Sequence, residues 1–427
     1  MESKLNMIEL PVKTKERAIL VAVDTKNLNR EMVEEHLAEL EELAITAGAE
    51  TIIKVIQERY AFDPAFYIGK GKAEELASLT EINDINLIIF DDDLSPVQVR
   101  NLERLIQRKI VDRSGLILDI FASRAKSKEA KTQVELAQLQ YMLPRLTRAW
   151  THLSKQFGGI GTKGPGETQI ETDRRIIRTR ISLLKEKLKK IEEQRTTQSQ
   201  GRKDFVRISL VGYTNAGKST LFNLLTNSQV FAEDKLFATL DSTTRIFDLN
   251  KDNKVLISDT VGFIRKLPPH LIASFKSTLN EVRDADIILH VVDMSHPFFE
   301  DHIEVVDKTL KELGCEKKNQ IKIFNKLDVV EDKNRIQYIR AKYEGGVIIS
   351  AERGINVSSL KTNIINMIEK SFVEEKVDLE VTDSKKAASI HSLAHVLTEV
   401  YDDNYIHITY RANRENSLKI KKILYGG

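Results

Sequence analysis

The chain has 427 residues, 41% of them hydrophobic, so it can form several cores, and its length predicts roughly two to four domains. Its 65 basic and 63 acidic side chains leave a formal net charge of +2, so any nucleic-acid surface has to be local. The single cysteine, Cys315, excludes an internal disulfide framework and is typical of a reducing cytosol. The start is polar and no apolar stretch approaches the ~20 residues that span a membrane, so we expect a cytoplasmic protein without a membrane partner.

Residues 1–123 predict a small, mostly parallel α/β domain, because apolar strands alternate with helical patterns. One helix is expected over 29–47, before a helix stop at Gly48, and another starts at Ser95, with proline in its first turn. The expected strands are 17–24, 51–56, 85–90 and 109–112.

Two stretches of this domain each allow two interpretations. Tyr67–Lys72 is either a phosphate-binding loop or a glycine turn at a helix start, because it lacks the glycine spacing of a dinucleotide site. Asp91–Asp93 follows a strand, and it is either a Mg²⁺ site or a solvated acidic loop.

Residues 124–204 predict a long antiparallel helical hairpin followed by a polar linker from 194. Its first arm, 126–143, carries an apolar stripe, and its second arm starts near Asp173 with apolar residues at alternating steps of four and three. These apolar positions are Ala130, Val134, Ala137 and Tyr141 in the first arm, and Ile177, Ile181, Leu184, Leu188 and Ile191 in the second.

The link between the two arms is rich in glycine and basic residues and contains Trp150, the only tryptophan. Such a loop buries little, and cations with interspersed aromatic rings suit phosphate backbones and unstacked bases, so we favour an RNA contact over a plain connector. The candidate RNA-binding residues are Arg145, Arg148, Lys155, Lys163, Arg174 and Arg175.

The next domain, 205–373, begins with the motif G-x-x-x-x-G-K-S between an apolar strand and a helix. The glycines allow backbone N–H groups to point at a phosphate chain, and the following helix adds its positive end. Lys218 is expected to reach the β- and γ-phosphates, and the Ser219 hydroxyl to ligate Mg²⁺.

Three further signals follow at strand ends or loops, in the order expected of a GTP-binding domain. A threonine after the phosphate loop can ligate Mg²⁺ and contact the γ-phosphate, and Thr239, Thr243 and Thr244 compete for this role. Asp259 can hold Mg²⁺ through water, and the N–H of Gly262 can contact the γ-phosphate.

The motif N-K-x-D at 325–328 selects the base. Asp328 can accept from both N1–H and the exocyclic amine of guanine, whereas adenine offers neither donor there. Asn325 can tie this loop to the phosphate loop, and the backbone N–H groups of Ser350 and Ala351 can read guanine O6.

Phe263 stands where many GTPases carry the glutamine that orients the attacking water, so we expect slow intrinsic hydrolysis and stimulation by a partner. In some relatives with a hydrophobic residue here, an asparagine at the position of Asn215 helps to hold K⁺ near the phosphates.

Residues 374–427 predict a small α+β domain. Its expected elements are a strand at 377–382, a helix at 385–400, a strand at 405–410 and a basic helix from 413 to 424.

Several motifs together resemble those of the HflX-type GTPases, a translation-factor-related class. The matching stretches are Gly69–Lys72, Gly158–Gly161, Gly164–Thr168, Gly212–Ser219, Leu236–Asp241, Asp259–Ile264 and Asn325–Asp328. The resemblance implies a bacterial cytosolic protein that binds the large (50S) ribosomal subunit and its rRNA, and that splits or rescues stalled ribosomes under stress. It implies that the N-terminal domain and hairpin reach toward the peptidyl-transferase region. It selects Thr239 as the first-switch Mg²⁺ ligand, and it points to Gly69–Lys72 for a weak ATP activity.

The complete expectation is an α/β protein, in which a P-loop GTPase domain follows the α/β domain with its hairpin and precedes the α+β domain. Lys218, Thr239 and Gly262 are the expected catalytic residues, and Ser219 and Thr239 the expected metal ligands. The residues expected at GTP or GDP are Gly212, Tyr213, Thr214, Asn215, Ala216, Gly217, Lys218, Ser219, Phe237, Ala238, Thr239, Leu240, Asp241, Asp259, Thr260, Val261, Gly262, Asn325, Lys326, Leu327, Asp328, Ser350 and Ala351.

Two functions remain open from the sequence. One is a monomeric ribosome-associated GTPase with Mg²⁺ and K⁺ as cofactors, and the other is a GTP-gated adaptor of a protein partner without RNA binding. The glycine-rich basic loop, 155–168, discriminates between them, because only the first function needs it.

Overall fold

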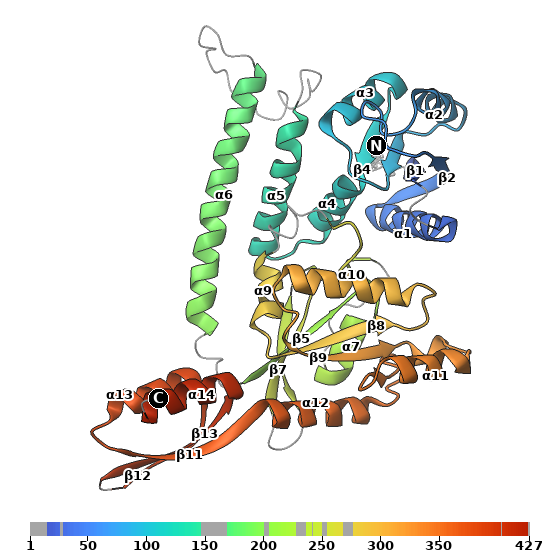
Figure 1. The fold of residues 1–427 in the computed structure, drawn as a ribbon. Coiled ribbons are helices and arrows are strands. Elements are labelled where there is room, and N and C mark those ends of the chain that lie inside the picture. Colours follow the sequence, from blue (N-terminus) through green and yellow to red (C-terminus); the bar gives the residue numbers. More distant parts are fainter. Residues whose placement is uncertain are drawn as a thin grey trace, which may run out of the picture. The chain divides into compact units, whose positions relative to one another are not determined.

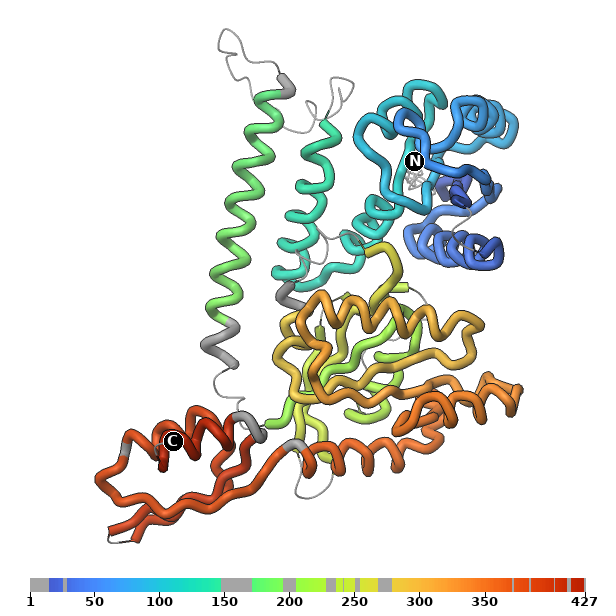
Figure 2. Tube along the Cα trace, in the orientation of Figure 1, coloured from blue at the N-terminus to red at the C-terminus, as the bar shows by residue number. Residues whose placement is uncertain are grey.

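The structure is a computed structural model, and it describes residues 15–25, 29–146, 169–199, 205–227, 236–240, 242–249, 254–267, 276–402 and 404–425 (Figure 1, Figure 2). The chain forms two compact units. The first takes residues from Met1–Ser123 and Ala137–Thr179, and the second from Arg124–Leu136 and Arg180–Gly427. The finer four-part division expected from the sequence stays a prediction.

The first unit contains a parallel sheet in the order β2-β1-β3-β4. All four expected strands form, and β1 and β3 are buried because their residues are almost entirely apolar. The elements are β1 (Glu16–Asp24), α1 (Arg30–Ala47), β2 (Ala49–Glu58), α2 (Lys70–Ile82), β3 (Leu87–Phe90), α3 (Pro96–Ile106), β4 (Lys109–Asp112) and α4 (Arg113–Arg124).

Local sequence signals set the helix ends in this unit. Gly48 ends α1 in the left-handed region, with φ of 94°, a conformation that glycine adopts without strain. Ser95 begins α3 with a capping box, in which its side chain and that of Gln98 each accept from the other residue's backbone N–H. Both predicted boundaries are correct.

The structure favours the glycine turn for Tyr67–Lys72, whereas Asp91–Asp93 is not the expected solvated loop, because Asp91 is buried. Gly69 precedes α2, and its N–H donates to the Gln57 side chain rather than facing an open loop. The carboxylates of the acidic stretch accept hydrogen bonds from other side chains: Asp91 from Arg113, Asp92 from Tyr67 and Asp93 from Ser114.

The hairpin consists of α5 (Lys128–Met142) and α6 (Gln169–Ser199), which lie side by side. The Arg180 guanidinium donates to Glu135 across the pair at 2.7 Å, and Arg174 donates to the Leu146 carbonyl at 3.0 Å. The predicted apolar stripes lie on the more buried faces, as Ala130, Val134, Ala137, Ile177 and Leu184 show.

The second unit contains a six-stranded sheet in the order β10-β9-β8-β5-β7-β6, which is parallel except for β6. Apolar side chains of α7 and α12 and of the central strands form a core. The elements are β5 (Val206–Gly212), α7 (Lys218–Thr226), β6 (Thr243–Asp248), β7 (Lys254–Asp259), α9 (Lys276–Asp284), β8 (Ile287–Asp293), α10 (Phe299–Glu312), β9 (Asn319–Asn325), α11 (Lys333–Lys342), β10 (Val347–Ile348) and α12 (Val357–Ser371).

The C-terminal segment corrects one expectation, because the helix expected over 385–400 ends early. The backbone becomes extended at Ala394, and the following residues form a strand that pairs with β13 in the sheet β11-β13-β12. The β-branched Val396, Thr398 and Val400 favour this strand. The elements are β11 (Phe372–Glu380), α13 (Ser384–Leu393), β12 (His395–Tyr401), β13 (Tyr405–Asn413) and α14 (Arg414–Tyr425).

Within the ranges that the structure describes, no helix combines the length and the apolar character that crossing a membrane requires.

Candidate functional site

The loop between β5 and α7 requires glycine at two positions. Gly217 has φ of 88°, and a Cβ there would lie 2.2 Å from Nδ2 of Asn325. A Cβ on Gly212 would lie 2.2 Å from the Val291 carbonyl oxygen. The loop therefore passes so close to β8 and to Asn325 that no side chain fits at either glycine.

Lys218 begins α7 and is buried against this loop. Its ammonium donates to the Tyr213 carbonyl at 2.7 Å. Burial lowers its pKa to about 8, although the Asp259 carboxylate opposes that shift. A cation held in a low-dielectric pocket at a helix N-terminus is an effective partner for phosphate oxygens.

Three side-chain oxygens converge beside Lys218. Ser219 Oγ lies 2.8 Å from Thr239 Oγ1, and the Ser219 hydroxyl donates to Asp259 Oδ2 at 2.7 Å. Asp259 is fully buried, burial raises its pKa, and its Oδ1 atom has no hydrogen-bond partner among the described residues. Oxygen donors with one unpaired buried oxygen fit a hard cation such as Mg²⁺.

The structure separates the three competing threonines. Thr243 and Thr244 lie in β6, opposite Asp259 and Ser258 of β7, whereas Thr239 lies in the preceding loop with its hydroxyl at Ser219. Asp241, which was also expected at the nucleotide, lies outside the described residues.

A cavity joins the phosphate loop to the segments after α7 and β7. Most of the residues that line it were expected at the nucleotide. They are Thr214, Asn215, Gly217, Lys218, Ser219, Thr220, Phe237, Ala238, Thr239, Thr260 and Gly262.

The base-selecting loops meet the phosphate loop through Asn325, which is buried. Its amide Nδ2 donates to the Ala216 carbonyl at 3.0 Å, and its Oδ1 accepts from the Ala351 N–H at 2.9 Å. Lys326 pairs with Asp293 at 2.8 Å, and the Asp328 carboxylate accepts from the Ser350 hydroxyl. Asp328 is therefore already oriented by one hydrogen-bond donor.

The backbone N–H groups of Ser350 and Ala351, which the sequence assigns to guanine O6, both have hydrogen-bond partners within the protein. The Ser350 N–H donates to the Ile355 carbonyl at 3.2 Å, and the Ala351 N–H donates to Asn325. Both donors are used within the protein because Ser350 pairs with Ile355 in an isolated β-bridge and Asn325 reaches across from β9.

Phe263 connects the phosphate loop to the segment after β7 through its backbone. Its N–H donates to the Gly212 carbonyl at 3.0 Å, and its carbonyl accepts from the Thr214 N–H at 2.8 Å. The Phe263 side chain is 2% exposed and does not line the cavity. An apolar ring placed there contributes packing, and it cannot orient water.

Sequence reasoning missed a second contact of the phosphate loop. The Tyr213 ring stacks on His302 of α10 at a centroid distance of 3.8 Å, and its hydroxyl accepts from the Arg265 N–H at 3.0 Å. Burial lowers the pKa of His302 to about 3, so the stacked imidazole is neutral. No local pattern signals this contact, because α10 is distant in sequence and supplies the ring through the tertiary fold.

The candidate RNA-binding residues divide into three groups. Arg145 interacts within the protein. It pairs with Asp112 at 2.8 Å, and its guanidinium lies 3.6 Å from the centre of the Tyr141 ring. Arg174 donates a hydrogen bond to the Leu146 carbonyl, and Arg175 is exposed. Arg148, Lys155 and Lys163 lie outside the described residues.

Three family models match consecutive parts of the chain. They are described as GTP-binding GTPase N-terminal (34–122), GTP-binding GTPase Middle Region (124–202) and 50S ribosome-binding GTPase (207–326). A GTPase HflX of Flavobacterium psychrophilum is 53% identical over 75% of this chain and 78% of its own length. The chain belongs to the HflX family of GTPases. It therefore binds GTP and hydrolyses it to GDP and phosphate.

Other HflX proteins cover more of the chain. That of Magnetococcus marinus is 45% identical over 90% of this chain and 89% of its own length, and that of Escherichia coli is 41% identical over 87% and 88%. A solved GTP-binding protein from the archaeon Sulfolobus solfataricus in complex with GDP matches with a TM-score of 0.42 and 25% identity, over 82% of this chain and 98% of that one.

The Asp328→Asn variant tests the base-reading assignment. We expect GTP to bind on the order of a hundredfold more weakly and XTP to bind better, because an amide N–H suits the xanthine O2 and cannot accept from guanine. Competition between labelled GTP and XTP measures this. Asp332→Asn is the matched control, because Asp332 caps α11 and asparagine is also a good cap. Retained guanine preference in the Asp328 variant would refute the assignment.

The Phe263→Gln variant tests whether that position can act on water. We expect no gain in intrinsic GTP turnover and a lower unfolding temperature, because the amide enters an apolar site and a buried unsatisfied amide costs about 1–3 kcal/mol. Turnover and thermal unfolding are measured beside Phe263→Leu, which keeps the site apolar. Faster hydrolysis in Phe263→Gln than in the unchanged chain would contradict the buried geometry.

Proposed function

We propose that this HflX-family GTPase binds the large (50S) ribosomal subunit and its rRNA, and that it splits or rescues stalled ribosomes under stress. The main support is the match of residues 207–326 to the model described as 50S ribosome-binding GTPase. The matched middle region, 124–202, contains the hairpin and the glycine-rich basic loop that the sequence assigns to RNA.

The GTP-dependent switch in this proposal is centred on Ser219 and Thr239. Both hydroxyls hold Mg²⁺, with Asp259 acting through water, and the bound ion supplies positive charge against the phosphates. Lys218 contacts the β- and γ-phosphates, and the Gly262 N–H contacts the γ-phosphate. Thr239 lies between α7 and β6, and its contact with the ion and the γ-phosphate makes its position depend on that phosphate.

We expect the same site to hydrolyse GTP slowly and to be stimulated by the ribosome. The Phe263 ring is buried and offers no group to the attacking water, so a further source of positive charge or positioning is needed. Asn215 lines the cavity and is the proposed ligand of K⁺.

The first test is sedimentation of the full chain with ribosomes on sucrose gradients, in GTP, in GDP and in a non-hydrolysable GTP analogue. We expect cosedimentation with large subunits in the analogue and release in GDP, because the γ-phosphate orders the Thr239 loop.

Deletion of residues 155–168 should abolish this cosedimentation while leaving GTP binding intact. An unchanged gradient profile for the deletion variant would instead favour a GTP-gated adaptor of a protein partner.

The second test compares intrinsic GTP hydrolysis in KCl and in NaCl at equal ionic strength. We expect faster turnover in KCl, and we expect Asn215→Ala to remove the difference, because it loses the proposed K⁺ ligand. Equal rates of the unchanged chain in both salts would exclude a K⁺ role.

A further inference from the structure

The GTPase sheet carries a second and larger cavity, of about 970 Å³, at the opposite end from the nucleotide loops. Its lining includes Asp286, just before β8, Asn319 at the start of β9 and Gly346, just before β10. The nucleotide loops follow the ends of β5, β7 and β9. Because these strands are parallel, the larger cavity lies at their N-terminal ends and the nucleotide loops lie at their C-terminal ends.

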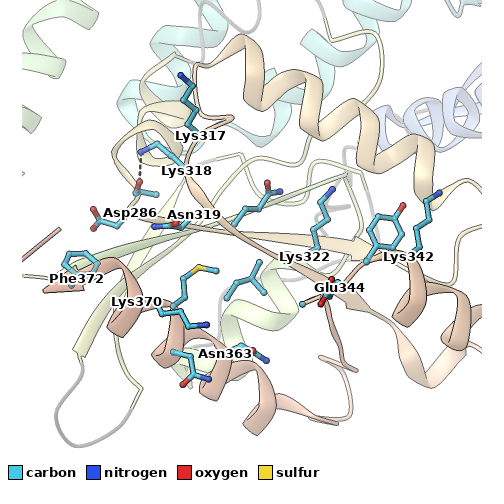
Figure 3. Close-up of a pocket in the computed structure, with 18 residues that line it drawn as sticks. Asp286, Lys317, Lys318, Asn319, Lys322, Lys342, Glu344, Asn363, Lys370 and Phe372 are labelled. Atoms are coloured by element: carbon cyan, nitrogen blue, oxygen red, sulfur yellow. Dashed lines mark hydrogen bonds between the residues drawn. The ribbon is translucent and has the colours of Figure 1, made fainter. Parts of the chain in front are cut away.

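Lysines from several elements surround this cavity, which we call the lysine groove (Figure 3). Figure 3 shows Lys317 and Lys318 on one side, Lys322 and Lys342 on the other, and Lys370 across the groove on α12. The acidic residues of the lining are Asp286 and Glu344, so positive charge predominates.

The lysines differ in how far their charge is already compensated. Lys322 pairs with Asp307 at 2.9 Å, and Lys342 pairs with Glu300 at 2.7 Å. Lys318 donates to the neutral Ala285 carbonyl at 2.6 Å, and its charge is partly compensated by the Asp286 carboxylate.

Lys317 and Lys370 are exposed, and neither has a hydrogen bond or ion pair within the described ranges. The Asp286 carboxylate of the lining already interacts with a backbone donor and with Lys318. Asp286 accepts from the Arg207 N–H at 2.9 Å, and burial raises its pKa. An uncompensated concentration of cations in a groove raises the local concentration of anions.

The remaining lining fits a phosphodiester chain better than an apolar ligand. The amide side chains of Asn363 and Asn366 stand on α12. That of Asn363 donates to the Ser359 carbonyl at 3.1 Å, and that of Asn366 can donate to phosphate and sugar oxygens. Exposed lysines from separate elements also suit a ligand that continues beyond the groove, and a long polyanion has that property.

We propose that the lysine groove is a second RNA-binding surface, which takes the sugar-phosphate backbone of an RNA helix. The proposal deepens the proposed function and rests on it, because it gives the GTPase domain an rRNA contact of its own. That contact lies at the N-terminal ends of the sheet strands, opposite the nucleotide loops. Recognition is of charge and backbone shape, so it carries no base specificity.

The test uses the full chain with Lys317→Ala and Lys370→Ala combined. The matched control combines Lys308→Ala and Lys333→Ala, which removes the same charge from exposed positions outside the groove. The probes are a 24-base-pair RNA duplex and purified large ribosomal subunits, each titrated at several KCl concentrations. We expect the groove variant to bind the duplex about tenfold more weakly, with a salt slope smaller by about 2, because each lost phosphate contact lowers it by about 1.

The outcomes separate this proposal from the proposed function. A groove variant with the salt slope of the control, or an unchanged chain that does not bind the duplex, would overturn the groove proposal. Loss of subunit binding with unchanged duplex binding would also overturn it, because the groove would then contact an acidic protein. If the unchanged chain fails to bind subunits, the proposed ribosomal function fails, and the duplex titration still decides the groove.

Discussion

The two hydrogen bonds of the Asn325 side chain fix the phosphate-binding loop relative to the base-binding loops. Its Nδ2 holds the Ala216 carbonyl and its Oδ1 holds the Ala351 N–H, both within a buried environment. Loss of either partner leaves a buried polar group unsatisfied, which costs about 1–3 kcal/mol. The loop also depends on Gly217, because it can approach Asn325 this closely only if position 217 has no side chain. One amide thus sets the distance between the place for phosphates and the place for a base.

Contiguous motifs made much of this site accessible from the sequence. The glycines that allow the loop, the lysine and serine that follow them, and the N-K-x-D segment are each local patterns whose chemistry dictates their geometry. Contacts between distant segments were not accessible. The stacking of Tyr213 on His302 and the pairing of Lys326 with Asp293 depend on which elements the sheet order brings together. The same limit explains Ala351, whose N–H donates to Asn325 of β9, whereas the Ser350 N–H donates to the nearby Ile355.

The fold shows the same division between local and tertiary information. Strong alternation of apolar strands and capped helices predicted the N-terminal sheet, and the seam of the second arm predicted the hairpin. The sequence after Ala394 is compatible with both helix and strand, and it forms a strand because it pairs with β13. Arg145 was assigned to RNA because it lies near a basic loop, yet Asp112, distant in sequence, holds its guanidinium. Where a residue has two possible partners, the tertiary structure determines which one it contacts. A local sequence pattern does not contain that information.

The oxygens of Ser219, Thr239 and Asp259 converge, and we attribute this convergence to one cation that they share with the phosphates. A crystal structure of the protein with Mg²⁺ and a non-hydrolysable GTP analogue tests this most directly. The account predicts that the Ser219 and Thr239 hydroxyls both ligate the ion, with Asp259 behind a water molecule and the Asn325 hydrogen bonds unchanged. A complex in which Thr243 or Thr244 ligates the ion, with Thr239 turned away, would contradict it.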